Sequence, residues 1–304
     1  MRDARDGDVR ARRRGLLSPV GVPLVLAAVT VLVQVAYPLL DGRALAWSTT
    51  ATVVLFCAAS LAHAALTAGA RTAVLVLLVA GGAGLVAEAV GTATGFPFGP
   101  YEYTGTLGWE VLDVPVLIPL AWTMMAWPML LLGRRLADAL VGSRSRATTA
   151  LTTALTTALT AVLGGLGLAS WDLYLDPQMT DAGHWVFASP EPGLPGVPGI
   201  PLTNYAGWVL VSLVMVRALD VVVPRTAGRG RAADELVPAL LLGWTWLGSA
   251  LANVAFFGRP EVAAYGFVGM GVLVGPYLWL HVRGARRSLD GPAPARVRRS
   301  GSRA

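Results

Sequence analysis

The chain has 304 residues, of which 55% are hydrophobic and only 14% are charged, and its mean hydropathy is +0.60. A soluble domain carries about a quarter charged residues, so this composition excludes an ordinary soluble enzyme. The net charge of +6 invites a nucleic-acid interpretation. However, every basic residue is an arginine at the end of an apolar run or in a tail, where it orients a membrane protein and meets anionic lipid. The single cysteine, Cys57, excludes an intrachain disulfide and a cysteine metal cluster.

Eight apolar runs are long enough to cross a bilayer core, which needs roughly 20 apolar residues. They cover residues 20–40, 44–68, 72–91, 114–133, 147–170, 202–223, 236–257 and 262–281. The sequence therefore predicts an all-α, polytopic bundle of eight transmembrane helices in the cell membrane. A single transmembrane domain covers 20–281, between basic tails at 1–19 and 282–304.

Arginine placement predicts the orientation of this bundle. With a cytoplasmic N-terminus, 22 of the 24 arginines fall in the tails or in cytoplasmic turns, and only Arg43 and Arg259 fall outside. Such asymmetry follows the positive-inside rule. Both termini are therefore predicted to be cytoplasmic, with the two long outer loops at 92–113 and 171–201.

The third span carries Glu88 near its outer end, where a charged side chain costs a few kcal/mol unless it is paired, hydrated or protonated. The loop after it reads GFPFGPYEYTGTLGWEVLD and contains five aromatic residues, namely Phe96, Phe98, Tyr101, Tyr103 and Trp109. Any one of them fits an interfacial aromatic belt. Five together, interrupted by proline and glycine, favour a structured loop that walls an apolar groove.

The fifth span delivers WDLYLDPQM to the outer surface, which places Asp172 and Asp176 about one helical turn apart beside Trp171 and Tyr174. Pro177 is expected to end the helix soon afterwards. A proline-rich loop then runs to the start of the sixth span, where Asn204 lies in the motif GIPLTNY. The alternative for Asp172 is a carboxylate that only caps and hydrates its helix end.

In this topology several acids converge on the outer side among aromatic rings, without a neighbouring basic residue. They are Glu88, Glu102, Asp172, Asp176 and Glu261, and the amides of Asn204 and Asn253 join them. A carboxylic acid kept neutral near pH 7 is a proton donor. The sequence has no HExxH motif, no GxSxG elbow, no phosphate-binding loop and only one DxxxD, which disfavours metal hydrolysis, serine hydrolysis, nucleotide use and prenyl transfer. Acid chemistry on a hydrophobic substrate remains.

Three motifs, GFPFGPYEYTG, WDLYLDPQM and GIPLTNYAGW, resemble the membrane carotenoid biosynthesis family, whose characterised members are carotenoid hydratases, including the bisanhydrobacterioruberin hydratase type. The resemblance covers roughly residues 80 to 280, judged by the apolar spans. It implies addition of water to the terminal double bond of an acyclic carotenoid end, with no cofactor or metal. It also implies a carotenoid substrate, a lipid bilayer and other carotenoid enzymes as partners.

We assign roles as a hypothesis from the residues. Asp172 is the acid that touches the alkene, Asp176 is its charged neighbour, and Glu88 orients the water. Ring faces stabilise the tertiary cation by about 0.5 to 2 kcal/mol each. The predicted substrate-binding residues are Trp171, Tyr174, Phe96, Phe98, Tyr101, Tyr103, Glu102 and Asn204. Two alternatives stay open: a membrane carotenoid-binding or scaffold protein, and another carotenoid-tailoring enzyme such as an isomerase or prenyl transferase.

Overall fold

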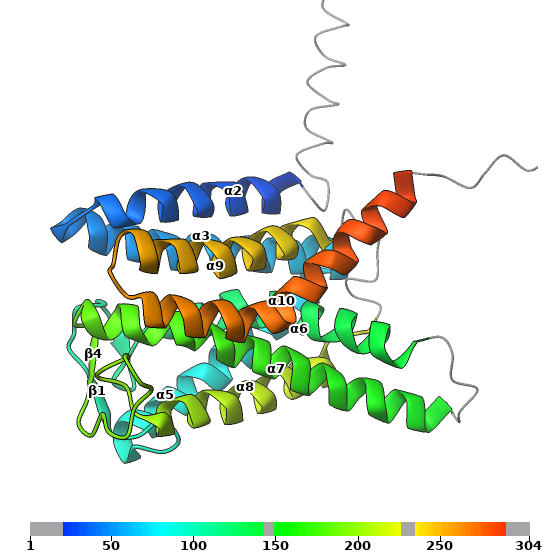
Figure 1. Ribbon diagram of the computed structural model, residues 1–304. Coiled ribbons are helices and arrows are strands. Elements are labelled where there is room, and N and C mark those ends of the chain that lie inside the picture. The colour runs from blue at the N-terminus through cyan, green and yellow to red at the C-terminus, as the bar shows by residue number, and fades with distance from the viewer. Residues whose placement is uncertain (1–20, 143–148, 226–234, 290–304) are drawn as a thin grey trace, which may run out of the picture.

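The structure, a computed structural model, describes residues 21–142, 149–225 and 235–289 (Figure 1). Within these ranges eight helices are long and apolar enough to cross a membrane, which confirms the predicted all-α bundle. They are α2 (Gly21–Ala36) with its extension η1 (Tyr37–Leu39), α3 (Gly42–Ala68), the continuous run of α4 (Ala70–Val76), η2 (Leu77–Gly81) and α5 (Gly82–Thr94), α6 (Leu117–Val141), α7 (Thr149–Asp181), α8 (Leu202–Val222), α9 (Leu236–Ala255) and α10 (Pro260–Leu289). The side of the membrane on which the termini lie stays a prediction.

Two helices extend well beyond the predicted spans. Helix α7 continues to Asp181, so the second outer loop begins at residue 182 instead of 171. Pro177 removes only one backbone donor from the helix, and the last turns are anchored by the buried Met179 and by the Thr180 hydroxyl, which donates to the Asp176 carbonyl. Helix α10 runs on through Leu289, into the predicted tail 282–304. The predicted tail 1–19 and residues 290–304 lie outside the described residues.

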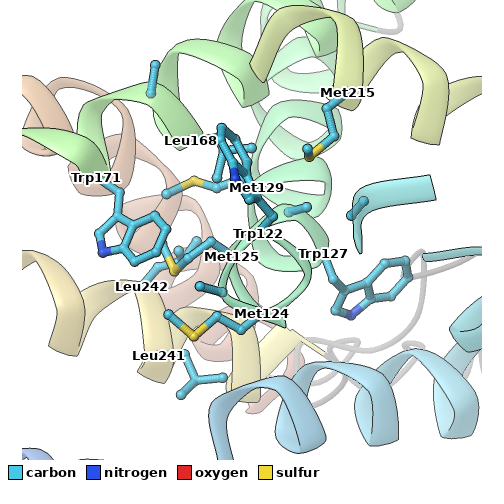
Figure 2. Packing of buried hydrophobic residues seen from close by; sticks show 14 of the residues in the cluster. Trp122, Met124, Met125, Trp127, Met129, Leu168, Trp171, Met215, Leu241 and Leu242 are labelled. Carbon is cyan, nitrogen blue, oxygen red and sulfur yellow. The ribbon is translucent and has the colours of Figure 1, made fainter. Parts of the chain in front are cut away.

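Helix α6 occupies the centre of the bundle. It is apolar on every side and most of its residues are buried, as expected of a helix surrounded by other helices. Its side chains Trp122, Met125 and Met129 pack against residues of α7, α8 and α9 (Figure 2). Gly133 allows α7 to approach closely, because a Cβ atom there would lie 2.6 Å from the Thr160 carbonyl oxygen.

The two long loops meet at the end of the bundle opposite to the start of α2 and the end of α10 (Figure 1). Strand β1 (Tyr101–Tyr103) from the first loop pairs antiparallel with β4 (Trp185–Phe187) from the second, with Glu102 opposite Val186. A second small ladder joins β2 (Glu110–Val111) to β3 (Val114–Pro115). Because side chains alternate along a strand, Tyr101 and Tyr103 point to one face of the ladder and Glu102 points to the other. The paired loops form one cap over the helix ends.

Candidate active site

Glu88 lies in α5 and is only 6% exposed. Its carboxylate accepts hydrogen bonds from three side chains: the Tyr101 hydroxyl, the Tyr103 hydroxyl at 2.8 Å, and the Trp122 indole N–H at 3.0 Å. The two tyrosines come from the cap and the tryptophan from α6, so the site forms only when the loop folds back onto the bundle. Three neutral donors around one carboxylate hold it in place and stabilise its charged form.

A second acidic group lies on α7. Asp172 and Asp176 are 0% and 2% exposed, and they share one helix face, as their four-residue spacing predicts. The Asn204 side-chain amide, at the start of α8, donates to the Asp172 carboxylate at 2.9 Å and also to Asp176. Asn204 therefore bridges the two carboxyl groups, and the second oxygen of Asp172 is buried without a hydrogen-bond partner in the described structure. Two negative charges held this close would repel each other, so the arrangement favours a proton shared by the pair.

Glu88 and Asp176, one residue from each acidic group, meet at a pocket with a cavity volume of about 180 Å³. Glu88, Asp176 and Asn204 line it, and no arginine, lysine or histidine is among its lining residues. The pocket therefore brings Glu88 and Asp176 to one space, and Asn204 joins Asp176 to the buried Asp172.

Aromatic rings make up most of the wall around these acids. Trp122 and Trp208 stack at a centroid distance of 4.1 Å, and Trp171 meets Trp208 edge-on at 5.9 Å. Lining rings also come from Phe98, Tyr101, Tyr103, Tyr174, Trp185 and Phe187. Ring faces attract cations, so this wall suits a developing positive charge on a hydrophobic ligand.

The hydroxyl groups of Tyr101 and Tyr103 belong to the cap, outside the spans. Burial raises the pKa of both hydroxyls, and the neighbouring Glu88 charge raises the pKa of each further. Both side chains therefore stay protonated near neutral pH and remain hydrogen-bond donors to Glu88.

Most of the predicted site residues come together at this pocket. The lining includes Glu88, Asp176, Trp171, Tyr174, Phe98, Tyr101, Tyr103 and Asn204. Asp172, assigned above as the acid that touches the alkene, does not line the pocket, because it lies behind Asp176 and Asn204 with no exposed surface. Glu261 also lies outside the pocket lining, and Asn253 lines it.

Two predicted substrate-binding residues lie elsewhere. Phe96 is 64% exposed, since the chain turns between it and Phe98 and only the latter faces inward. Glu102 is exposed because it lies between two inward-facing tyrosines on β1, where the pleat directs it away from the pocket. Neither residue lines the pocket.

Several lining residues were missing from the sequence-based set, among them Trp122, Trp185, Phe187 and Trp208. Trp185 and Phe187 are separated by two positions in a loop, a period-two signal for a strand face that matches the YEY of β1. Trp122 and Trp208 lie inside apolar helices. No local sequence signal distinguishes them from the other apolar residues around them. Among the described residues, no group of three or more histidine, cysteine, aspartate or glutamate side chains is placed to hold a metal ion.

Comparison with known proteins agrees with the motifs. A family model described as "Carotenoid biosynthesis protein" matches residues 48–274, which include Glu88, Asp172, Asp176 and Asn204. The curated protein named bisanhydrobacterioruberin hydratase, from Haloarcula japonica, is 31% identical over 188 residues, which cover 60% of this chain and 58% of that protein. The chain thus matches less than two thirds of the length of this relative. No solved structure matches. Since the family model covers well over half of the sequence, the chain belongs to the carotenoid biosynthesis protein family.

Proposed function

We propose that the protein is a carotenoid hydratase that adds water to the terminal double bond of an acyclic carotenoid end. The observation that carries this proposal is the pocket itself: Asp176, which Asn204 joins to the buried Asp172, and the separate carboxylate of Glu88 face one aromatic, apolar space. The named activity of the 31% identical relative supports the same reaction class. Addition of water is redox-neutral, so the proposal requires no redox cofactor.

Asp176 delivers the proton. It faces the pocket and exchanges a proton with Asp172 behind it, and Asn204 holds both carboxyl groups in position. The proton adds to the CH carbon of the terminal double bond, the π bond breaks, and the positive charge develops on the carbon that bears two methyl groups. Asp176 is left as a carboxylate, and its negative charge is spread over the hydrogen-bonded pair. Asp172 therefore acts as a positioning residue and Asp176 as the catalytic acid.

Water then captures the tertiary cation. Its oxygen forms the new C–O bond, and Glu88 accepts the proton that the water oxygen loses, which gives the tertiary alcohol. The proton on Glu88 returns to the aspartate pair, to which it is electrostatically close, and this resets the site. The wall of Trp122, Trp171 and Trp208 stabilises the cation before capture.

Pigment analysis tests this function directly. We expect cells that express the full chain together with enzymes for an acyclic carotenoid to accumulate a pigment heavier by one water. Replacement Asp176→Asn keeps the side-chain volume but removes the transferable proton, so product formation should fall by about a hundredfold or more. Asp181→Asn is the matched control, because Asp181 is exposed on the same helix.

The outcomes separate the alternatives. Product unchanged in Asp176→Asn would exclude Asp176 as the acid. A chain that co-purifies with the unmodified carotenoid, and never forms the heavier pigment, would be a binding or scaffold protein. A product of unchanged mass would indicate isomerisation, and a product heavier by a prenyl unit would indicate prenyl transfer.

A further inference from the structure

The same pocket has a second polar region that the proposed acid chemistry does not use. The pocket extends from α5 and α8 on one side of the bundle to α2, α3 and α9 on the other (Figure 1). At the second side its lining includes Gln34, Thr49, Thr52, Ser249 and Asn253. All five are neutral, and they come from three helices.

Two of these residues present polar atoms without a partner. The Asn253 side chain is 1% exposed, and its amide nitrogen donates to the Ser249 carbonyl at 2.9 Å. That hydrogen bond leaves the Asn253 side-chain oxygen buried with no hydrogen-bond partner among the described residues. The Thr52 hydroxyl is also buried without a partner there. Buried polar groups in folded proteins are nearly always paired, so both atoms are expected to bind something in the pocket.

Other polar side chains of this region, unlike Thr52, already have hydrogen-bond partners. Thr49 and Thr245 each donate to the carbonyl four residues earlier in their own helix, and Gln34 accepts from the Trp244 indole N–H. A single buried water needs two to four polar partners. The Asn253 amide oxygen can accept a hydrogen bond from a water molecule, and the Thr52 hydroxyl can donate or accept one, so each fits a small neutral ligand with an O–H group.

At the opposite region of the pocket, around Glu88, water has no comparable route to the carboxylate. The carboxylate is closed on its own side by Tyr101, Tyr103 and Trp122, which donate to it, and Phe98 is also fully buried nearby. A water that attacks a cation between Glu88 and Asp176 must therefore reach it through the pocket.

We propose that Asn253 and Thr52 form a water-binding station that supplies the co-substrate to the acidic site, an inference that rests on the hydratase function proposed above. The station holds water in an apolar pocket that otherwise favours the polyene. It acts after protonation: it affects how often the cation is captured and leaves its formation unchanged.

This role predicts a change in how the cation divides between capture by water and return to an alkene. When water is scarce, the cation loses a proton from a neighbouring carbon to a carboxylate and the π bond re-forms. In D₂O the aspartate pair carries deuterium, so the returned carotenoid gains a C–D bond, or becomes the isomer with a terminal methylene group when a methyl proton is lost. The ratio of these return products to the alcohol measures capture, and it does not depend on how much protein is folded.

The test compares Asn253→Leu and Thr52→Val with the wild-type chain in D₂O-containing membranes, using mass spectrometry and proton NMR of the pigments. We expect alcohol formation to fall about tenfold, corresponding to loss of one good hydrogen bond, while the ratio of return products to alcohol rises by a similar factor. Asn253→Ser, which keeps a polar atom, should recover part of the ratio. Ser212→Ala is the matched control, since the Ser212 hydroxyl is also buried without a partner in the described structure but does not line the pocket.

The failure of this inference differs from the failure of the hydratase function. If the wild-type chain forms neither alcohol nor return products, the function itself is wrong. If the wild-type chain hydrates and the two variants keep its ratio, or lose alcohol and return products together, the water station is wrong and the hydratase function stands.

Discussion

Glu88 depends on three donors from two segments outside its own helix. Tyr101 and Tyr103 belong to strand β1 of the cap and Trp122 belongs to α6, and together they bond both carboxylate oxygens. In the proposed mechanism, each donor stabilises the charge of Glu88 before Glu88 accepts a proton from water. The strength of Glu88 as a base is therefore set by the number of these hydrogen bonds.

Removing one of these donors should change the pH dependence of hydration. In Tyr103→Phe the carboxylate loses a hydrogen bond to its charged form, so Glu88 becomes easier to protonate and the acid limb of the pH–rate profile should move to higher pH. We expect about a tenfold lower rate at neutral pH, because one hydrogen bond to a charged group is lost. Tyr205→Phe is the control, since Tyr205 lies outside the pocket lining. An unshifted acid limb in Tyr103→Phe would contradict the assigned role of Glu88.

The acids of the site could be identified from the sequence, because acidic residues inside an apolar span or at its membrane boundary are uncommon: Glu88 lies inside a predicted span, and Asp172 and Asp176 follow the end of another. Which of the two aspartates faces the pocket could not be predicted from the sequence. Both aspartates share one face of α7, and only the rotation of α7 against α8, fixed by the Asn204 hydrogen bonds, decides which carboxyl group meets the pocket. That rotation comes from packing between helices, which one helix sequence does not reveal.

At the scale of elements, the cap is the feature that the sequence described least well. The aromatic content of the first outer loop predicted a wall around a groove, and Phe98, Tyr101 and Tyr103 of this loop line the pocket. The pairing of β1 with β4 joins segments more than eighty residues apart, and such short strands carry no local signal of their partner. The length of α7 was underestimated for a similar reason: contacts of its last turns outweigh the local effect of Pro177.

The contact between α5 and the cap can be tested with a single methyl group. At Gly91 a Cβ atom would lie 2.9 Å from the Tyr101 hydroxyl oxygen and 3.0 Å from a ring carbon of Phe98. Gly91→Ala should displace Tyr101 from Glu88 and lower product formation by about tenfold, the effect of one lost hydrogen bond. Gly82→Ala on the same span has no atom within 4 Å of the added carbon, so activity should be retained. Equal activity of the two variants would show that Tyr101 is not needed at this position.

The cap should also loosen in mild acid. His184 lies beside β4, and its ring nitrogen Nδ1 is 2.7 Å from the Thr106 hydroxyl of the other loop. Burial lowers the pKa of His184 below its ordinary value. The folded cap therefore binds a proton less readily than the unfolded cap, and its stability is complete above about pH 6.5 and is lost as the pH falls through the lowered pKa.

Hydrogen exchange of the β1 and β4 amides, corrected for the intrinsic pH dependence of exchange, measures this loosening. Protection should decrease between about pH 6.5 and pH 5 in the wild-type chain. In His184→Gln, which keeps a hydrogen-bonding side chain but does not titrate, protection should be independent of pH over this interval. If protection is still lost with falling pH in His184→Gln, the loss is caused by the titration of another group.

At the scale of the whole molecule, the helices position a polar site at one end of an apolar bundle, and the arginines distinguish the two ends. Among the described residues, the pocket end carries Arg43 and Arg259. The opposite end carries Arg71, Arg134, Arg135, Arg217, Arg225, Arg283 and Arg286. The positive-inside rule predicts that the pocket end faces the outer side of the membrane. The acidic site would then lie at outer-leaflet depth, within reach of a carotenoid end in the bilayer.

Cysteine labelling tests this orientation with little disturbance, because Cys57 is buried and provides an unlabelled background. Glu110 is exposed in the cap, and Ala70 is exposed in the turn between α3 and α4 at the other end of the bundle. In intact cells a membrane-impermeant maleimide should label Glu110→Cys and should reach Ala70→Cys only after permeabilisation. The reverse pattern would show that the bundle has the opposite orientation. The acid pair would then meet its substrate from the cytoplasmic leaflet. Neither substitution changes an arginine, so the charge asymmetry that sets the orientation is left intact.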